Sequence, residues 1–140
     1  MKDDLKKIIL SQDDIIAEIT KKYDVEEYLS KLSKHAKILP YYSGSFLKGF
    51  IAYYLNDILK ENAYLTIIII DKDSRDKGLG KLLLESSISD LINRGFKSYR
   101  LEVLKKNEKA LAFYKKYGFE IEKDLGNSYL MNLNLEENAK

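Results

Sequence analysis

The sequence has no cysteine and only one histidine, and these two shortages remove several kinds of chemistry. Without cysteine there can be no disulfide, no thiol nucleophile and no thiolate ligand for a metal. A single histidine cannot form a metal cluster, so we expect no metal cofactor. No apolar run reaches the roughly 18 residues of a membrane-spanning helix, and no secretory signal pattern follows the initial methionine. We therefore expect a cytoplasmic protein that does not bind membranes.

The sequence also lacks an excess of charge of either sign. It carries 24 basic and 22 acidic side chains, and its formal net charge is +2. A balance this even argues against nucleic acid as a partner. With 140 residues and a hydrophobic content of 45%, the chain is expected to form a single domain, residues 1–140, with one core.

The hydrophobic pattern predicts a mixed α/β protein. The expected strands are about 5–10, 36–42, 46–55, 63–71, 99–104, 119–123 and 128–135, and the expected helices are about 11–22, 24–35, 78–94 and 107–118. Ser11 and Asp24 are the expected caps of the first two helices, and Pro40 indicates an edge strand or a bulge. The four isoleucines Ile67–Ile70 fit a strand buried on both faces. A helical crossover between this strand and 99–104 implies that the two strands are parallel.

The stretch from Tyr64 to Lys81 is the most informative part of the chain. It reads as a buried strand, a charged loop and a helix that opens with Gly78 and Gly80. Glycine lets the backbone approach a phosphate closely, and a helix N-terminus presents free N–H groups and partial positive charge. Positive charge nearby comes from Arg75, Lys77 and Lys81. We interpret this stretch as a cradle for the diphosphate of a nucleotide-like cofactor.

Two common phosphate loops do not fit this stretch. A Walker loop would need Ser or Thr after Gly80-Lys81, but Leu82 follows. The dinucleotide pattern would need a third glycine where Leu83 stands. A helix start whose glycines serve only packing remains the alternative interpretation of these residues taken alone.

Glu102 is a candidate general base. In the segment Leu101-Glu102-Val103 it alternates with apolar residues, so it points to the opposite face of its strand, together with Arg100. A carboxylate there can accept a proton from a substrate ammonium. A partly solvated strand glutamate without a catalytic role is the alternative.

Tyr114 is a candidate general acid. Asn107 is the expected cap of the helix that carries it, and the two residues lie seven apart, so they share a helix face. A phenol held close to a departing thiolate can protonate it. An ordinary core tyrosine on an amphipathic helix is the alternative.

Taken together, these residues resemble the GNAT superfamily of acetyl-CoA-dependent N-acetyltransferases, over about Tyr64 to Leu135. Arg75-x-x-Gly78-x-Gly80 matches the family's (Q/R)-x-x-G-x-(G/A) pyrophosphate loop, after a strand and at the start of a helix. The second family motif is matched by Asn107, Ala110, Phe113-Tyr114 and Gly118-Phe119. The resemblance implies a mixed, mostly antiparallel sheet with one parallel pair, 63–71 with 99–104, and about four flanking helices.

The resemblance also implies roles for single residues. The backbone of Ile68, Ile69 and Ile70 would pair with the pantetheine arm of acetyl-CoA, and an N–H of Ile69 or Ile70 would hold the thioester oxyanion. The diphosphate would lie on the amides of Asp76, Lys77, Gly78, Leu79, Gly80 and Lys81, with Arg75 nearby. Asn107 would contact the cofactor arm, Glu102 would act as the base, and Tyr114 would protonate the CoA thiolate.

The implied reaction is direct transfer of an acetyl group to a primary amine in a ternary complex, because a chain without cysteine excludes a thioenzyme intermediate. The preferred acceptor is a small-molecule amine or amino sugar. A protein N-terminus or lysine is the alternative, since the Leu-Glu-Val and Tyr114 spacing also resembles the subgroup that acetylates N-terminal amines. The stretch from Lys123 to Leu130 lacks that subgroup's Arg-plus-Tyr-Tyr signature. A third hypothesis is an acyl-CoA-binding module without turnover. The enzyme is expected to be a monomer or homodimer.

Overall fold

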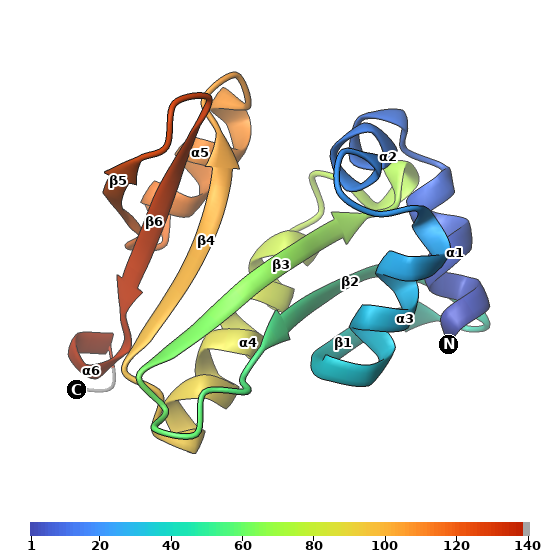
Figure 1. Ribbon diagram of the computed structural model, residues 1–140. Helices are drawn as coiled ribbons and strands as arrows, with labels where there is room; N and C mark the ends of the chain where they lie inside the picture. The colour runs from blue at the N-terminus through green and yellow to red at the C-terminus, as the bar shows by residue number, and fades with distance from the viewer. Residues whose placement is uncertain (139–140) are drawn as a thin grey trace. The chain divides into compact units, whose positions relative to one another are not determined.

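The structure, a computed structural model, describes residues 1–138 and divides the chain into two compact units (Figure 1). Unit 1 comprises Met1–Tyr54 and Ile67–Ser87, and unit 2 comprises Leu55–Thr66 and the chain from Ile88 onward. The elements are α1 (Lys2–Leu10), α2 (Asp13–Thr20), α3 (Val25–His35), β1 (Ala36–Ser43), β2 (Phe46–Tyr54), β3 (Asn62–Ile70), the short 3-10 helix η1 (Lys72–Ser74), α4 (Leu79–Arg94), β4 (Ser98–Leu104), α5 (Glu108–Lys116), β5 (Glu120–Asp124), β6 (Ser128–Asn134) and α6 (Leu135–Asn138). Both β3 and α4 contribute residues to both units.

The six strands follow the order β1-β2-β3-β4-β6-β5. The pairs β1/β2, β4/β6 and β5/β6 are antiparallel. The pair β3/β4 is parallel, and its register runs from Asn62↔Ser98 to Tyr64↔Arg100. The sheet is therefore mixed, with the parallel pair that the sequence predicted, and the predicted fold class is confirmed.

The first element differs from the prediction, because residues 5–10 belong to helix α1 and not to a strand. The buried residues of this element are Leu5, Ile8 and Ile9. This spacing places all three side chains on one face of a helix, and short apolar runs fit either structure until their partners are known. Ser11 also differs from its predicted role: its hydroxyl donates to the carbonyl of Ile8 at the end of α1, and Gln12 precedes α2.

Helices α1, α2 and α3 cover one face of unit 1 (Figure 1). Their apolar residues form one cluster with alternate residues of β2 and β3, namely Phe50, Ala52, Ile67 and Ile69. Asp24 caps α3 as predicted, because its carboxylate accepts a hydrogen bond of 2.7 Å from the N–H of Glu27. Pro40 lies in β1, which is an edge strand with a register shift between Tyr41 and Tyr42, so that prediction is confirmed as well.

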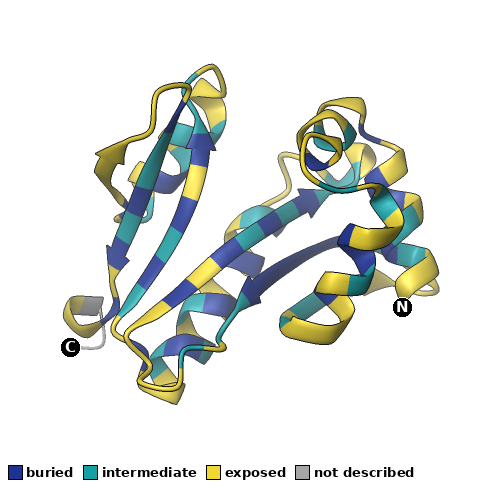
Figure 2. Cartoon of the chain, in the orientation of Figure 1, coloured by how far each residue is buried: buried dark blue, intermediate teal, exposed yellow. Residues whose placement is uncertain are grey.

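Burial alternates along β3, and the prediction of a strand fully buried on both faces is wrong (Figure 2). Ala63, Leu65, Ile67 and Ile69 are buried, while Ile68 and Ile70 are only partly covered. A run of isoleucines has no polar residue that would mark the less buried face, so the sequence pattern could not separate the two faces.

Gly49 lets β2 approach β3 and the first turn of α4. A Cβ atom added at this position would lie 2.9 Å from the carbonyl oxygen of Ile69 and 3.2 Å from a methyl group of Leu79. The first of these neighbours is backbone and cannot rotate away. The absence of a side chain at Gly49 therefore allows the start of α4 to pack closely against the end of β3.

We expect Gly49→Ala to lower the free energy of unfolding by about 1–3 kcal/mol, because the added methyl group overpacks this contact. Ser45→Ala, in the exposed turn between β1 and β2, is the control and should change stability by less than about 0.5 kcal/mol. Urea unfolding of both variants checks the prediction. An equal stability of Gly49→Ala and wild type would show that the backbone contact is looser than described.

In unit 2, α5 packs on β4 through aromatic side chains. The ring of Phe119 lies 5.8 Å from that of Tyr99 and 5.6 Å from that of Tyr114. Gly95 and Gly118 follow α4 and α5 with φ of 87° and 97°, the left-handed backbone expected of a helix C-terminal glycine. The polar sequence from Glu136 to Lys140 predicts a frayed tail, but α6 extends to Asn138; residues 139–140 lie outside the described residues.

Candidate active site

The loop between β3 and α4 lies entirely in unit 1. Its backbone turns through two left-handed residues, Asp76 with φ 62° and Gly78 with φ 81°. The carbonyl of Gly78 accepts the first helical hydrogen bond of α4, from the N–H of Leu82 at 3.1 Å. The N–H groups of the first turn of a helix have no partner within the helix, so they are available to an anion. The strand, loop and helix start predicted between Tyr64 and Lys81 are therefore present.

The carbonyl of Ile70 fixes the beginning of this loop. It accepts hydrogen bonds from the buried amide of Gln12 at 2.8 Å and from Nε of Arg75 at 3.3 Å. Arg75 was predicted to supply charge beside a phosphate, and here its side chain also closes the loop onto the strand. Gln12 lies 58 residues away along the chain, and no motif or spacing in the sequence pointed to it.

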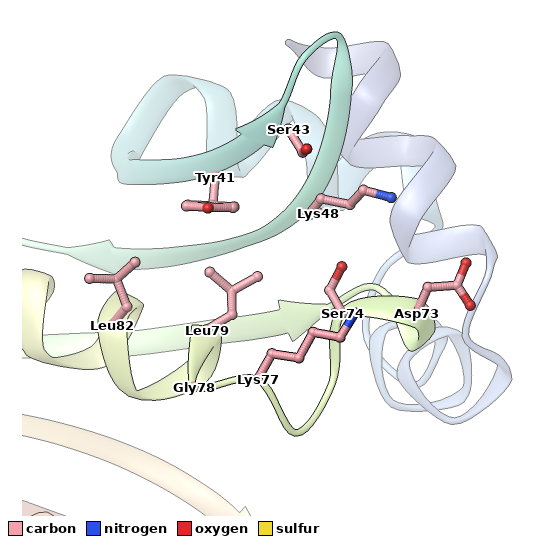
Figure 3. Close-up of a pocket in the computed structure, with 9 residues that line it drawn as sticks. All are labelled: Tyr41, Ser43, Lys48, Asp73, Ser74, Lys77, Gly78, Leu79 and Leu82. Carbon is pink, nitrogen blue, oxygen red and sulfur yellow. The ribbon is translucent and has the colours of Figure 1, made fainter.

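A cavity of about 390 Å³ adjoins the loop in unit 1 (Figure 3). It is lined by Tyr41, Ser43, Lys48, Asp73, Ser74, Lys77, Gly78, Leu79 and Leu82. Three of these residues, Lys77, Gly78 and Leu79, belong to the predicted cofactor loop. The others come from β1, β2, η1 and α4, and the sequence did not assign them to a site.

The other predicted site residues lie in unit 2. Asn107 caps α5, because its side-chain oxygen accepts a hydrogen bond of 3.1 Å from the N–H of Ala110. Tyr114 is buried, with 7% of its surface exposed, and its ring contacts Phe113 and Phe119. Burial raises the pKa of the Tyr114 hydroxyl, so this group keeps its proton throughout the neutral range.

Glu102 is an exposed residue of β4, but its carboxylate is held in place. The hydroxyl of Ser128, a buried residue at the start of β6, donates a hydrogen bond of 2.5 Å to Oε2 of Glu102. Arg100, on the same face, pairs instead with Glu122 at 2.9 Å. Burial and the nearby Glu102 carboxylate raise the pKa of Tyr64 on β3. The Glu102 carboxylate is held by the Ser128 hydroxyl and lies near the neutral phenol of Tyr64. It can therefore bind an ammonium group.

Glu102 and Tyr114 lie on opposite faces of β4. The buried face of β4 carries Tyr99, which connects through the ring of Phe119 to Tyr114, while Glu102 alternates onto the other face. In the chain up to residue 138, the register of β4 with β3 ends at Arg100, and β4 runs on to Leu104. Beyond Arg100, side chains on both faces of β4 can therefore reach the edge of β4 that is not paired with β3.

Residues 1–138 contain no group of three or more histidine, aspartate or glutamate residues arranged to hold a metal ion. None of their helices has the length and apolar character that crossing a membrane requires.

The model of the Acetyltransferase (GNAT) family matches residues 5–119. The chain belongs to this family, and the predicted class of acyltransferase is confirmed at that level. The [ribosomal protein bS18]-alanine N-acetyltransferase of Salmonella typhimurium is 37% identical over 68 residues, which are 49% of this chain and 46% of that protein. The matched part thus spans about half the length of this curated relative.

Solved structures show the same fold at lower identity. The PaiA N-acetyltransferase of Thermoplasma acidophilum, solved in complex with coenzyme A, superposes with a TM-score of 0.79 at 23% identity, over 95% of this chain and 92% of that chain. A GNAT family acetyltransferase from Elizabethkingia anophelis with acetyl-CoA bound gives a TM-score of 0.72 at 16% identity, over 91% and 88% of the two chains. At these identities the likeness establishes the fold.

Proposed function

We propose that this chain transfers the acetyl group of acetyl-CoA to a primary amine, with both reactants bound at the same time. The observation that carries the proposal is the family match to residues 5–119, because that segment includes the β3–α4 loop and both Glu102 and Tyr114. The two units then act as one acetyltransferase domain, residues 1–140.

In this proposal the β3–α4 loop holds the diphosphate of the cofactor. The amides of Asp76, Lys77, Gly78, Leu79, Gly80 and Lys81 supply hydrogen bonds, and the N-terminus of α4 supplies partial positive charge. The pantetheine arm pairs with the backbone of Ile68 and Ile69. The carbonyl of Ile70 already accepts two hydrogen bonds, so Ile70 offers the arm at most its N–H group. Asn107 contacts the arm through the part of its amide that does not cap α5.

The reaction then proceeds by direct attack. Glu102 takes a proton from the substrate ammonium, and the neutral nitrogen attacks the thioester carbon. An N–H of Ile69 or Ile70 stabilises the oxyanion. The carbon–sulfur bond breaks, and the departing thiolate takes the proton of the Tyr114 hydroxyl. The acetylated nitrogen then loses its second proton to solvent, Glu102 releases the proton that it took, and solvent returns a proton to Tyr114. The products are the acetylated amine, CoA and one proton. Binding both reactants together supplies much of the acceleration.

The side chain of Ser128 serves the base in this proposal. Its hydroxyl occupies one lone pair of Oε2 and leaves the other carboxylate oxygen of Glu102 for the ammonium. Tyr114 lies on the opposite face of β4 from Glu102, which fits a separate proton-transfer group for each reactant. The acceptor nitrogen attacks the thioester carbon on the side of Glu102, and the sulfur leaves on the side of Tyr114, so that each has its own proton-transfer group.

The comparison favours the alternative acceptor class over the small-molecule amine that the sequence favoured. The Salmonella relative acts on an alanine, whose side chain carries no nitrogen, so the group acetylated there is an α-amine. We propose an N-terminal α-amine of a peptide as the first acceptor class for this chain.

Release of free CoA thiol from acetyl-CoA in the presence of candidate amines tests the proposal. The acceptors are a peptide that begins with alanine, the same peptide with a blocked N-terminus, a polyamine and an amino sugar. We expect turnover with the free peptide and none with the blocked one. Turnover with only the polyamine or the amino sugar would restore the small-molecule prediction. Silence with every acceptor, together with tight CoA binding, would favour the binding module without turnover.

A further inference from the structure

Gln12 is a polar residue that is almost completely buried in unit 1, with 3% of its surface exposed. It lies between α1 and α2, where its N–H donates to the carbonyl of Ile9 and its carbonyl accepts from the N–H of Ile16, both at 3.1 Å. Its side chain makes no capping hydrogen bond to α2. The amide instead donates to the carbonyl of Ile70, at the end of β3, at 2.8 Å (Figure 1). Burying an amide is costly unless it is hydrogen-bonded, so this contact ties the helix junction to the strand.

The Gln12 amide is the firmer of the two donors to the Ile70 carbonyl. The other donor is Nε of Arg75, at the longer distance of 3.3 Å and on an exposed residue. Arg75 is also proposed to lie beside the diphosphate, so its contact with Ile70 has a competitor. A hydrogen bond shielded from water is electrostatically stronger than an exposed one. The position of the Ile70 carbonyl therefore depends mainly on Gln12.

The backbone groups at the end of β3 alternate between the two edges of the strand. The N–H of Asp71 donates to the carbonyl of Lys48 in β2 at 2.8 Å, so Asp71 faces β2. In an extended strand the N–H and C=O of one residue point to the same edge, and the next residue uses the opposite edge. Ile70 therefore faces away from β2, and its N–H shares an edge with its own carbonyl. By holding that carbonyl, Gln12 also fixes the direction of the Ile70 N–H.

We propose that Gln12 is a positioning residue for acetyl transfer, which holds Ile70 so that the Ile70 N–H points at the thioester oxygen of acetyl-CoA. This inference rests on the proposed function, which assigns the oxyanion to an N–H of Ile69 or Ile70, and it selects Ile70. Gln12 acts through Ile70 and not through a reactant. Such a donor contributes most in the transition state, when negative charge develops on the oxygen. Loss of the Gln12 amide should therefore slow the reaction more than it weakens the binding of coenzyme A.

Gln12→Met tests the role of the amide, because it removes the donor and keeps the length of the side chain. Loss of a whole oxyanion donor costs about 10²–10³ in rate. Here the donor is displaced and not removed, so we expect the single-turnover rate with acetyl-CoA and peptide to fall by about tenfold to a hundredfold. The affinity for coenzyme A, which has no thioester carbonyl, should change by less than about twofold in titration calorimetry.

Ser11→Ala is the matched control at the same junction. Ser11 directly precedes Gln12, and its hydroxyl donates to the carbonyl of Ile8 at 2.6 Å, so this variant also removes a hydrogen bond beside α1. It should lower the urea concentration at the midpoint of unfolding and leave the single-turnover rate unchanged. An equal loss of rate in Ser11→Ala and Gln12→Met would show that Gln12 serves only the stability of the junction.

Gln12→Glu adds a readout that packing alone would not move, and it keeps the size of the side chain should Gln12→Met fail to fold. A carboxylate cannot donate to the Ile70 carbonyl, but a carboxylic acid can. Burial raises the pKa of the introduced carboxyl group, so lowering the pH from about 8.5 to about 5.5 should protonate it. The rate of Gln12→Glu relative to wild type should therefore rise as the pH falls, whereas the relative rate of Gln12→Met should stay constant.

The carbonyl stretch of bound acetyl-CoA, isolated in infrared spectra by ¹³C labelling of the acetyl group, tests the inference without an acceptor. A hydrogen bond to the thioester oxygen lowers the stretching frequency, so the frequency should be higher in Gln12→Met than in wild type. An unchanged frequency, or a wild-type single-turnover rate in Gln12→Met, would overturn the inference while acetyl-CoA still binds. Failure of wild type to bind acetyl-CoA at all would instead overturn the proposed function, and this inference with it.

Discussion

Gly78→Val should lower the affinity for coenzyme A by about tenfold to a hundredfold while the fold survives. Gly78 has φ of 81°, and an added Cβ would meet no atom within 4 Å. Steric space is therefore not the obstacle. A β-branched residue in the left-handed region costs about 1–3 kcal/mol, and the loop can avoid this cost only by changing conformation. The amides around Gly78 would then no longer point at one anion.

Matched glycine variants show whether the loop conformation is what matters. Gly95 follows α4 with φ of 87° and equally open space, so Gly95→Val carries the same kind of strain far along the chain from the loop. It should lower stability and leave the affinity for coenzyme A unchanged. Gly78→Asn should bind better than Gly78→Val, because asparagine tolerates the left-handed region. Unchanged affinity in Gly78→Val, by titration calorimetry, would exclude the loop from the cofactor site.

Local signals in the sequence were enough to predict the loop and two of the helix caps. Asp24 and Asn107 cap the helices that follow them, because a capping side chain needs only its next three residues. The same is true of the glycine-bearing loop before α4. Element type was less secure where a run was short. Leu5–Leu10 fits a strand or a helix by composition, and packing against β2 and β3 decides for the helix.

Contacts between distant segments could not be predicted. Ser128 reaches Glu102 diagonally across the β4/β6 pair, since Glu102 lies opposite Leu130 and Ser128 opposite Leu104. This contact depends on a register that only the packed sheet defines. The cavity joins Tyr41 of β1 and Lys48 of β2 to a loop about thirty residues further along the sequence. Neither Tyr41 nor Lys48 belongs to a sequence motif, so the cavity emerges only from the fold.

Tyr114→Phe should lower kcat by about a hundredfold. General acid catalysis by a positioned side chain contributes about 10²–10⁴ to a rate. The ring of Tyr114 packs against Phe113 and Phe119. Removing the hydroxyl therefore keeps the packing, so stability and the affinity for coenzyme A should change little. Because burial raises the pKa of Tyr114, its loss of a proton should not reduce the wild-type rate below about pH 10.

The measurement must isolate the chemical step, because release of CoA can limit kcat and hide a slower proton transfer. Single-turnover kinetics with saturating acceptor do this. Tyr117→Phe is the matched control, since Tyr117 directly follows α5, packs on Phe113 with ring centres 5.0 Å apart and has no proposed role. It should react at the wild-type rate. If Tyr114→Phe reacted equally fast in a single turnover, the thiolate would leave with a proton from water, and the buried hydroxyl would be a packing feature of α5.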